Sequence, residues 1–231
     1  MARADVQQDD LDTFIAKRER WLIDYQDPAY AARYRALVDR VRTKSSLLGL
    51  DEAFSRAVAT YAYKLMAYKD EYEVARLYTS GTFAKSLRET FSGKFKIQMH
   101  LAPPLLAKKD RHGHLIKQEY GGWMLTAFAI MRRFKGLRGG PFDLFGYTAE
   151  RKMERALRDE YLARIDTLLA TLSPTNAALA TEIASLPDTI RGFGHVKEAS
   201  VQSAQATLAG LMGKWNGTAE PGAKKTTLIG A

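Results

Sequence analysis

The chain has 231 residues, of which 46% are hydrophobic and 26% charged, and its formal net charge is +9. This composition is ordinary for a globular chain with a sizeable core. The absence of cysteine excludes iron–sulfur clusters, thiolate zinc sites and cysteine nucleophiles built by this chain. The first ten residues lack the apolar core of a secretory signal. The longest apolar run, Trp123 to Met131, is far shorter than the roughly 20 residues that span a bilayer. We therefore expect a soluble, cytoplasmic protein with no membrane partner.

The positive charge is concentrated in one segment. Residues 85–138 hold 12 basic and three acidic side chains, whereas the basic and acidic side chains are equal in number on either side of this segment. Such a block is usually a solvated face, and the alternative is a docking surface for an acidic partner. The candidate docking residues are Lys94, Lys96, Lys108 and Lys109.

The first third of the chain, residues 10–81, predicts three helices. Apolar residues recur at helical spacing over 10–26, and Asp27-Pro28 is a good start for a second helix. Asp51 starts a long third helix that we expect to continue to Gly81. Its apolar stripe comprises Phe54, Val58, Tyr61, Leu65, Tyr68 and Tyr72.

The middle, residues 92–138, changes in character. Hydrophobic and polar residues alternate from Lys94 to Leu101, as in a half-buried strand, and a second extended run covers Leu115 to Tyr120. These two runs predict a small antiparallel pair. Trp123 to Phe134 predicts a short, largely buried helix that ends at Gly136.

The last third, residues 147–215, is helical again. Thr148 caps one helix, Ser173-Pro174 starts the next, and Pro187 ends it. A final helix runs to about Trp215. Residues 1–9 are expected to be flexible and residues 216–231 disordered, because they contain little to bury. The sequence therefore predicts a single mainly α domain over 10–215, with a small antiparallel β pair in the middle third.

The sequence contains no recognisable catalytic motif: no phosphate loop, dinucleotide-binding glycine turn, nucleophile elbow or HExxH zinc pair. His112 and His114 fit a solvated turn better than a metal site, because the neighbouring cations oppose a dication. We therefore predict no catalytic residue and no metal ligand.

Two segments are rich in polar groups. The residues Lys69, Asp70, Glu71 and Arg76 fit ordinary surface ion pairs on a helix, and an interface or site lining is the alternative. The second segment is a glycine-rich loop ahead of a helix. It is either a structural connection or an anion site, because such loops leave backbone N–H groups free at a helix N-terminus. The candidate anion-binding residues are Arg191, Gly192, Gly194, His195 and Lys197.

Several long strings resemble the C-terminal region of the large fused form of indolepyruvate ferredoxin oxidoreductase. They are LMAYKDEYEVARLY (65–78), HLAPPLLA (100–107), LRGGPFDLFGYTAERKMERAL (137–157) and LPDTIRGFGHVKEA (186–199). They occur in the same order, and the resemblance extends from about Leu11 to Trp215.

The resemblance implies a parent enzyme that oxidatively decarboxylates aryl-2-oxoacids such as indolepyruvate to acyl-CoA. It implies thiamine diphosphate, coenzyme A and [4Fe–4S] clusters in other parts of that enzyme, and none of these cofactors in this chain. The expected role is an accessory or interaction domain without activity of its own. Its expected partners are the remaining domains or subunits, with ferredoxin as a further partner. The alternative is an independent basic helical module that binds nucleic acid, although no nucleic-acid-binding motif is present.

Overall fold

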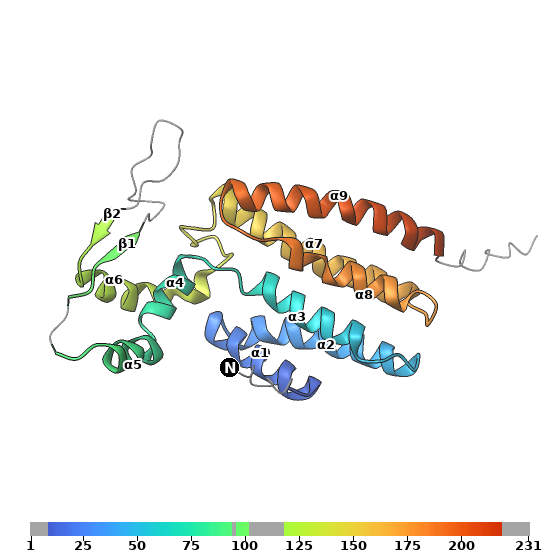
Figure 1. Cartoon of the computed structure of the whole chain (residues 1–231), viewed down its shortest axis with the longest axis horizontal. Coiled ribbons are helices and arrows are strands. Elements are labelled where there is room, and N and C mark those ends of the chain that lie inside the picture. The colour runs from blue at the N-terminus through green and yellow to red at the C-terminus, as the bar shows by residue number, and fades with distance from the viewer. Residues whose placement is uncertain (1–8, 94–95, 102–117, 219–231) are drawn as a thin grey trace, which may run out of the picture. The chain divides into compact units, whose positions relative to one another are not determined.

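The computed structural model describes residues 9–93, 96–101 and 118–218 (Figure 1). The fold is mainly α with one small antiparallel sheet, as predicted. Its α-helices are α1 (Leu11–Tyr25), α2 (Pro28–Leu47), α3 (Ala53–Met66), α4 (Glu71–Tyr78), α5 (Gly81–Thr90), α6 (Trp123–Met131), α7 (Ala149–Thr171), α8 (Ala177–Ser185) and α9 (His195–Thr218). The strands are β1 (Met99–Leu101) and β2 (Gln118–Tyr120), and the 3-10 helices are η1 (Arg132–Leu137) and η2 (Leu186–Thr189).

The chain divides into two compact units, each built from separate stretches of sequence. Unit 1 contains α2, α3, α8, α9 and most of α1 and α7. Unit 2 contains two stretches of the chain. Residues 21–28 include the last residues of α1, and residues 67–155 extend from the segment before α4 to the first residues of α7. The sequence predicted one domain over 10–215, with successive thirds of different character.

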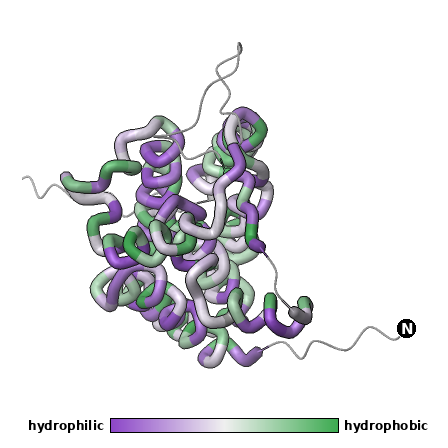
Figure 2. The backbone as a smooth tube through the Cα atoms, turned by 90° about the vertical axis from the view of Figure 1, so that its left-hand side faces the viewer, coloured by the Kyte–Doolittle hydropathy of each residue, from purple (hydrophilic) through white to green (hydrophobic). Residues whose placement is uncertain are grey.

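Unit 1 buries most of the apolar residues that recur at helical spacing, although Tyr61 of the predicted third helix is only half-buried. On α2, the stripe residues Tyr30, Tyr34, Leu37 and Val41 are all buried, and α3 packs against α8. The helices carry both hydrophobic and hydrophilic residues along their length, as an amphipathic helix must when only one face is buried (Figure 2). The periodicity of the sequence therefore identifies the core-facing sides correctly.

The predicted long third helix is wrong, because the chain breaks between α3 and α4. Helix α3 ends at Met66, and α4 begins at Glu71 with Asp70 as its N-cap. The carboxylate of Asp70 accepts a hydrogen bond from the backbone N–H of Glu73 at 2.8 Å, which satisfies one of the first unpaired donors of α4. Tyr68 and Tyr72 are both buried, so the break preserves the apolar stripe that suggested a continuous helix.

Two buried tyrosines bond the backbone carbonyls that the break releases. The Tyr30 hydroxyl donates to the carbonyl of Met66 at 2.9 Å, and the Tyr25 hydroxyl donates to the carbonyl of Tyr68 at 3.0 Å. A helix leaves its last carbonyls without partners inside the helix, and a buried carbonyl without a partner costs about 1–3 kcal/mol. These hydroxyls therefore stabilise the break directly.

Gly81 does not end a helix, as the sequence suggested, but begins α5. The Ser80 hydroxyl caps α5 by accepting a hydrogen bond from the N–H of Phe83 at 3.3 Å. Serine is a favourable N-cap because its oxygen replaces a missing helical acceptor. Gly81 therefore follows the N-cap of a new helix, whereas the sequence analysis placed it at the end of the preceding one.

The sheet confirms the predicted antiparallel pair in shortened form. β1 pairs with β2 so that Met99 faces Tyr120 and Leu101 faces Gln118. Met99 is buried and His100 is exposed, which agrees with the predicted alternation. Residues 94–95 and 115–117 of the two predicted runs lie outside the described residues.

The predicted buried helix at Trp123 forms, but it is not largely buried. Only Met124 and Phe128 of α6 are buried, and they join Ala75 and Met99 in a small apolar cluster of unit 2. The chain continues past Met131 as η1 to Leu137, so the helical turns do not end at Gly136. The apolar run from Trp123 to Met131 therefore contains more apolar side chains than this cluster buries.

The last third largely follows the sequence. The Thr148 hydroxyl accepts from the N–H of Arg151 at 3.3 Å, as expected for the cap of α7. Helix α8 begins later than predicted, because Asn176 folds residues 173–176 into a turn and accepts a hydrogen bond from the N–H of Ser173. Helix α9 continues past the buried Trp215 to Thr218, and the rest of the predicted disordered tail lies outside the described residues.

Replacing Tyr30 with phenylalanine should lower the free energy of unfolding by about 1–3 kcal/mol, because it leaves the terminal carbonyl of α3 without its donor. Tyr34→Phe is the matched control. The Tyr34 hydroxyl bonds the carbonyl of Ala59 at 3.0 Å, in the interior of α3, where the helix itself supplies a donor. Urea denaturation of both variants measures the difference. Equal losses would contradict a special role for the helix break.

Candidate interaction surface

No metal-binding cluster forms in the part of the chain that the structure describes. Among residues 9–93, 96–101 and 118–218, no group of three His, Asp or Glu side chains could hold a metal ion. Within the same ranges, no helix combines the length and hydrophobicity needed to cross a membrane. The described residues offer a cavity, a hollow and exposed apolar side chains as candidate features.

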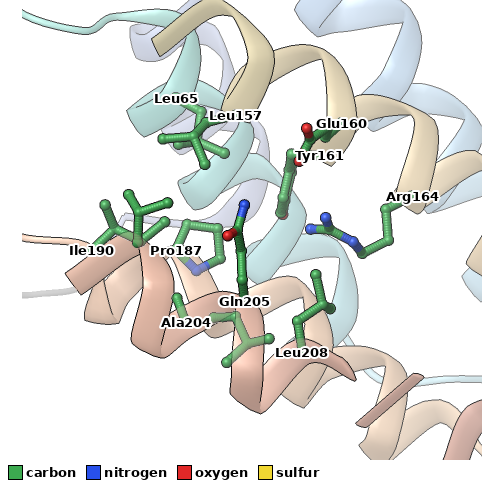
Figure 3. A pocket seen from close by; sticks show the side chains of 12 residues that line it. Leu65, Leu157, Glu160, Tyr161, Arg164, Pro187, Ile190, Ala204, Gln205 and Leu208 are labelled. Atoms are coloured by element: carbon green, nitrogen blue, oxygen red, sulfur yellow. The ribbon is translucent and has the colours of Figure 1, made fainter. Parts of the chain in front are cut away.

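A small cavity lies within unit 1, between α3, α7, η2 and α9 (Figure 3). Apolar side chains such as Leu65, Pro187 and Leu208 line it, together with Tyr161 and Arg164. Its volume is about 30 Å³. Ligand sites typically measure about 300–1,000 Å³, and a water molecule takes about 30 Å³ of liquid. This cavity is too small for an organic substrate.

Unit 2 is organised around a buried ion pair between Asp70 and Arg138. Both side chains are only 3% exposed, and the guanidinium binds the carboxylate through Nε at 2.5 Å and Nη2 at 2.9 Å. Nη1 of Arg138 donates to the carbonyl of Tyr25 at the end of α1. Burial works to lower the pKa of Arg138, but its hydrogen bonds with Asp70 outweigh this effect and hold the pKa above its ordinary value. The pair joins the end of α1, the start of α4 and the end of η1.

Further polar groups surround this pair. The Asp143 carboxylate accepts hydrogen bonds from the N–H groups of Gly139 and Gly146 and from the Tyr72 hydroxyl. Burial, reinforced by this carboxylate, raises the pKa of Tyr72. Gly146 has no room for a side chain, since a Cβ atom would lie 2.5 Å from an Asp143 oxygen. Asp143, which belongs to the loop after η1, thus fixes the conformation of that loop.

A second ion pair joins α4 to the first turn of α7. Nε of Arg151 lies 3.4 Å from a carboxylate oxygen of Glu71, and both side chains are largely buried. Burial raises the pKa of Glu71, although the nearby Arg151 acts in the opposite direction. The strings 65–78 and 137–157, which carry much of the family resemblance, therefore supply the internal network of unit 2.

The structure separates the four residues that the sequence grouped as surface ion pairs or site lining. Lys69 is exposed and precedes α4, so it does not lie on a helix as the sequence suggested. Arg76 instead pairs with Glu73, with two N–O distances of 2.7 Å. Asp70 and Glu71 belong to the internal network. A single sequence did not reveal their partners, which lie far along the chain.

An exposed apolar row follows α6 and η1. Trp123 is 61% exposed, Ile130 56%, Phe134 51% and Leu137 36%. Trp123 and Ile130 are seven residues apart on α6 and so share a face of that helix, and Phe134 and Leu137 are three residues apart on η1, which is one turn of a 3-10 helix. All but three of the exposed large hydrophobic side chains in the described residues belong to unit 2; the three in unit 1 are Leu47, Phe193 and Val196. Exposed apolar side chains that gather into a patch mark interaction sites, so we take this row as the candidate interaction surface.

Cations accompany this row. Arg132, Arg133 and Lys135 lie on η1 between the apolar residues. Interface cores are enriched in aromatic side chains and arginine, and energetic hot spots are enriched in tryptophan and arginine. Of the predicted docking residues, Lys96 is exposed, whereas Lys94, Lys108 and Lys109 lie outside the described residues. Sequence reasoning missed the row because it assigned the apolar run to the core.

The glycine-rich loop before α9 is exposed, as an anion site requires. Gly192 and Gly194 adopt positive φ of 93° and 54°, His195 is the exposed first residue of α9, and Lys197 is half-buried. A Cβ atom at Gly192 would lie 2.6 Å from the Val196 side chain. Arg191 bonds to Asp188. Turn geometry and close packing account for Gly192 without a ligand, and the anion site at this loop stays a prediction.

Comparison with known proteins places the chain in a family. The model of a family of unknown function, DUF6537, matches residues 11–210. The chain belongs to this family. No curated protein and no solved structure matches the chain. The match covers both units of this DUF6537 domain, including the internal network and the exposed row.

Replacing Asp70 with alanine should cost about 3–5 kcal/mol of unfolding free energy, because it leaves Arg138 buried without its counter-charge. Asp39→Ala is the control, since Asp39 pairs with Arg35 at the surface and such pairs contribute about 0–1 kcal/mol. Chemical denaturation followed by circular dichroism measures both. A loss at Asp70 no larger than that at Asp39 would show that the pair does not organise unit 2.

Proposed function

We propose that this chain is an accessory interaction domain of an indolepyruvate (aryl-2-oxoacid) ferredoxin oxidoreductase. The chemistry of that enzyme, oxidative decarboxylation of a 2-oxoacid to an acyl-CoA, would be carried by other domains or subunits. Thiamine diphosphate, coenzyme A and the [4Fe–4S] clusters would bind there, in the cytoplasm. The resemblance of four long strings supports the identity of the parent enzyme.

The observation that carries the interaction role is the exposed apolar row of α6 and η1. An isolated domain gains nothing by leaving Trp123 and Phe134 in water, since burying each aromatic side chain removes about 150–250 Å² from solvent. The adjacent cations Arg132 and Arg133 fit a partner surface that is acidic around an apolar centre. We therefore assign the row to contact with the catalytic part of the parent enzyme.

The aromatic side chains and arginines of this row also support the alternative function, nucleic-acid binding. Aromatic side chains beside arginine bind single strands by stacking on the bases. The two functions differ in their response to salt and to partner. Phosphate contacts make nucleic-acid binding weaken steeply with salt, whereas an apolar interface keeps most of its affinity.

The double variant Ile130→Ser/Phe134→Ser should bind the catalytic part of the parent enzyme about tenfold or more weakly, because hot-spot contacts each contribute about 2 kcal/mol or more. Its stability should change little, since both side chains are half-exposed. Leu47→Ser is the control, being 80% exposed in unit 1. Titration calorimetry at moderate and high salt gives the affinities.

Three results of this titration are decisive. Weaker binding by the double variant alone supports the proposal. Unchanged binding by that variant rules out the row as the contact. Salt-sensitive binding to random single-stranded DNA, without binding to the enzyme, would support the alternative function.

The purified chain alone should show no indolepyruvate-dependent reduction of a viologen dye and should bind no iron. It has no cysteine to hold a cluster, and its described residues contain no metal-binding group. The assay includes coenzyme A and thiamine diphosphate, with the assembled enzyme as the positive control. Turnover by the chain alone would contradict an accessory role.

A further inference from the structure

A second feature of unit 2 is a hollow of about 450 Å³, which is lined in part by the cations of η1 that accompany the apolar row. Its lining consists of Asp24, Arg76, Ser80, Arg132, Arg133 and Lys135. The volume is within the range of about 300–1,000 Å³ that small-molecule sites occupy. Four of its six lining residues are cationic and one is acidic, so the hollow is strongly positive.

Each cation can be followed to its partners. Arg76 is neutralised by Glu73 through a two-point contact and forms a wall of the hollow. Among the described residues, Arg132 donates through Nη1 alone, to the carbonyl of Thr79 at 3.1 Å and to its hydroxyl at 3.5 Å. Arg133 has no hydrogen bond or ion pair within the described part of the chain, and its side chain is exposed. Donors of two guanidinium groups therefore remain available to a ligand.

Lys135 is fixed in position by the end of α1. Its ammonium donates to the carbonyls of Ile23 at 2.9 Å and Asp24 at 2.7 Å, which uses two of its three N–H donors. Burial lowers the pKa of Lys135 and so do the nearby Arg138 and Arg76, whereas the carboxylates of Asp24 and Asp27 act in the opposite direction. An incoming anion would stabilise the charged form of this half-buried ammonium group.

The hollow also adjoins the start of a helix. Ser80 is the N-cap of the ten-residue helix α5, and the N-terminus of a helix carries partial positive charge and unpaired N–H groups. The charges of Arg132, Arg133 and Lys135, reduced by the carboxylate of Asp24, leave an excess of two positive charges. That excess matches a phosphoryl group, which carries about −1.5 to −2 near neutral pH, better than a single carboxylate.

We propose that this hollow binds a phosphoryl group, either of a free phosphate or pyrophosphate or of a nucleotide. Arg132 and Arg133 supply forked guanidinium donors, which suit phosphate oxygens, and Lys135 supplies a point charge. The inference does not depend on the parent enzyme, because it rests on the residues of the hollow alone.

Calorimetric titration of the full chain with inorganic phosphate, pyrophosphate and ADP, at an ionic strength held constant with sodium chloride, tests the proposal. The variant Arg132→Gln/Arg133→Gln should bind about tenfold or more weakly than the native chain, since charge-assisted hydrogen bonds are lost. Arg133→Gln alone, which breaks no internal bond, should weaken binding severalfold. The control Arg20→Gln/Lys214→Gln removes the same charge from exposed positions of unit 1 and should bind like the native chain.

The three titrations distinguish a free phosphate or pyrophosphate from a nucleotide as the ligand. Equal affinity for pyrophosphate and ADP indicates that the phosphates alone are recognised, and tighter binding of ADP indicates a nucleotide. The proposal is overturned if none of the three anions binds saturably, or if the Arg132/Arg133 variant and the control lose affinity equally. It is also overturned if only an acidic protein, and no phosphate, binds at this hollow.

Discussion

The buried ion pair of Asp70 with Arg138 is the constraint on which unit 2 depends. The Asp70 carboxylate both caps α4 and binds the guanidinium, and the guanidinium also reaches the last turn of α1. A buried charge is tolerated only when it is paired and hydrogen-bonded, so each partner requires the other in place. The end of α1, the break before α4 and the end of η1 are consequently fixed at one point.

This polar interior has a consequence for the surface. The apolar cluster that α6 joins is small, with Ala75, Met99, Met124 and Phe128 as its buried members, although unit 2 also buries Leu22, Tyr25, Tyr68 and Tyr72. This cluster covers one side of α6 and leaves Trp123 and Ile130 exposed. The arrangement therefore favours a unit that completes its burial against a partner. The proposed accessory role follows from that incompleteness together with the resemblance in sequence.

Local patterns predicted most of the helices and the antiparallel pairing. The stripe of α2 and the cap at Thr148 are explicit in the sequence, because each depends on neighbours within one or two helical turns. The break after Met66 was not predictable in this way. Tyr68 and Tyr72 continue the apolar period across it, and the bonds that stabilise the break come from Tyr25 and Tyr30, about 40 residues earlier.

The candidate site was predictable only in part. The sequence located the positive charge in the middle segment, and Arg132, Arg133 and Lys135 of the hollow belong to it. It also placed Arg138 there, where the structure shows a buried structural partner rather than a docking residue. Hydrophobicity alone assigned Trp123 to the core, because a single sequence does not state how much surface the rest of a unit can cover.

Hydrogen exchange of the chain, alone and assembled with the catalytic part of the parent enzyme, tests the interaction role most directly. The account predicts that the backbone amides of α6 and η1, residues 123–137, become markedly more protected on assembly, while those of α2 in unit 1 change little. Assembly without added protection at residues 123–137, or with protection confined to unit 1, would contradict it.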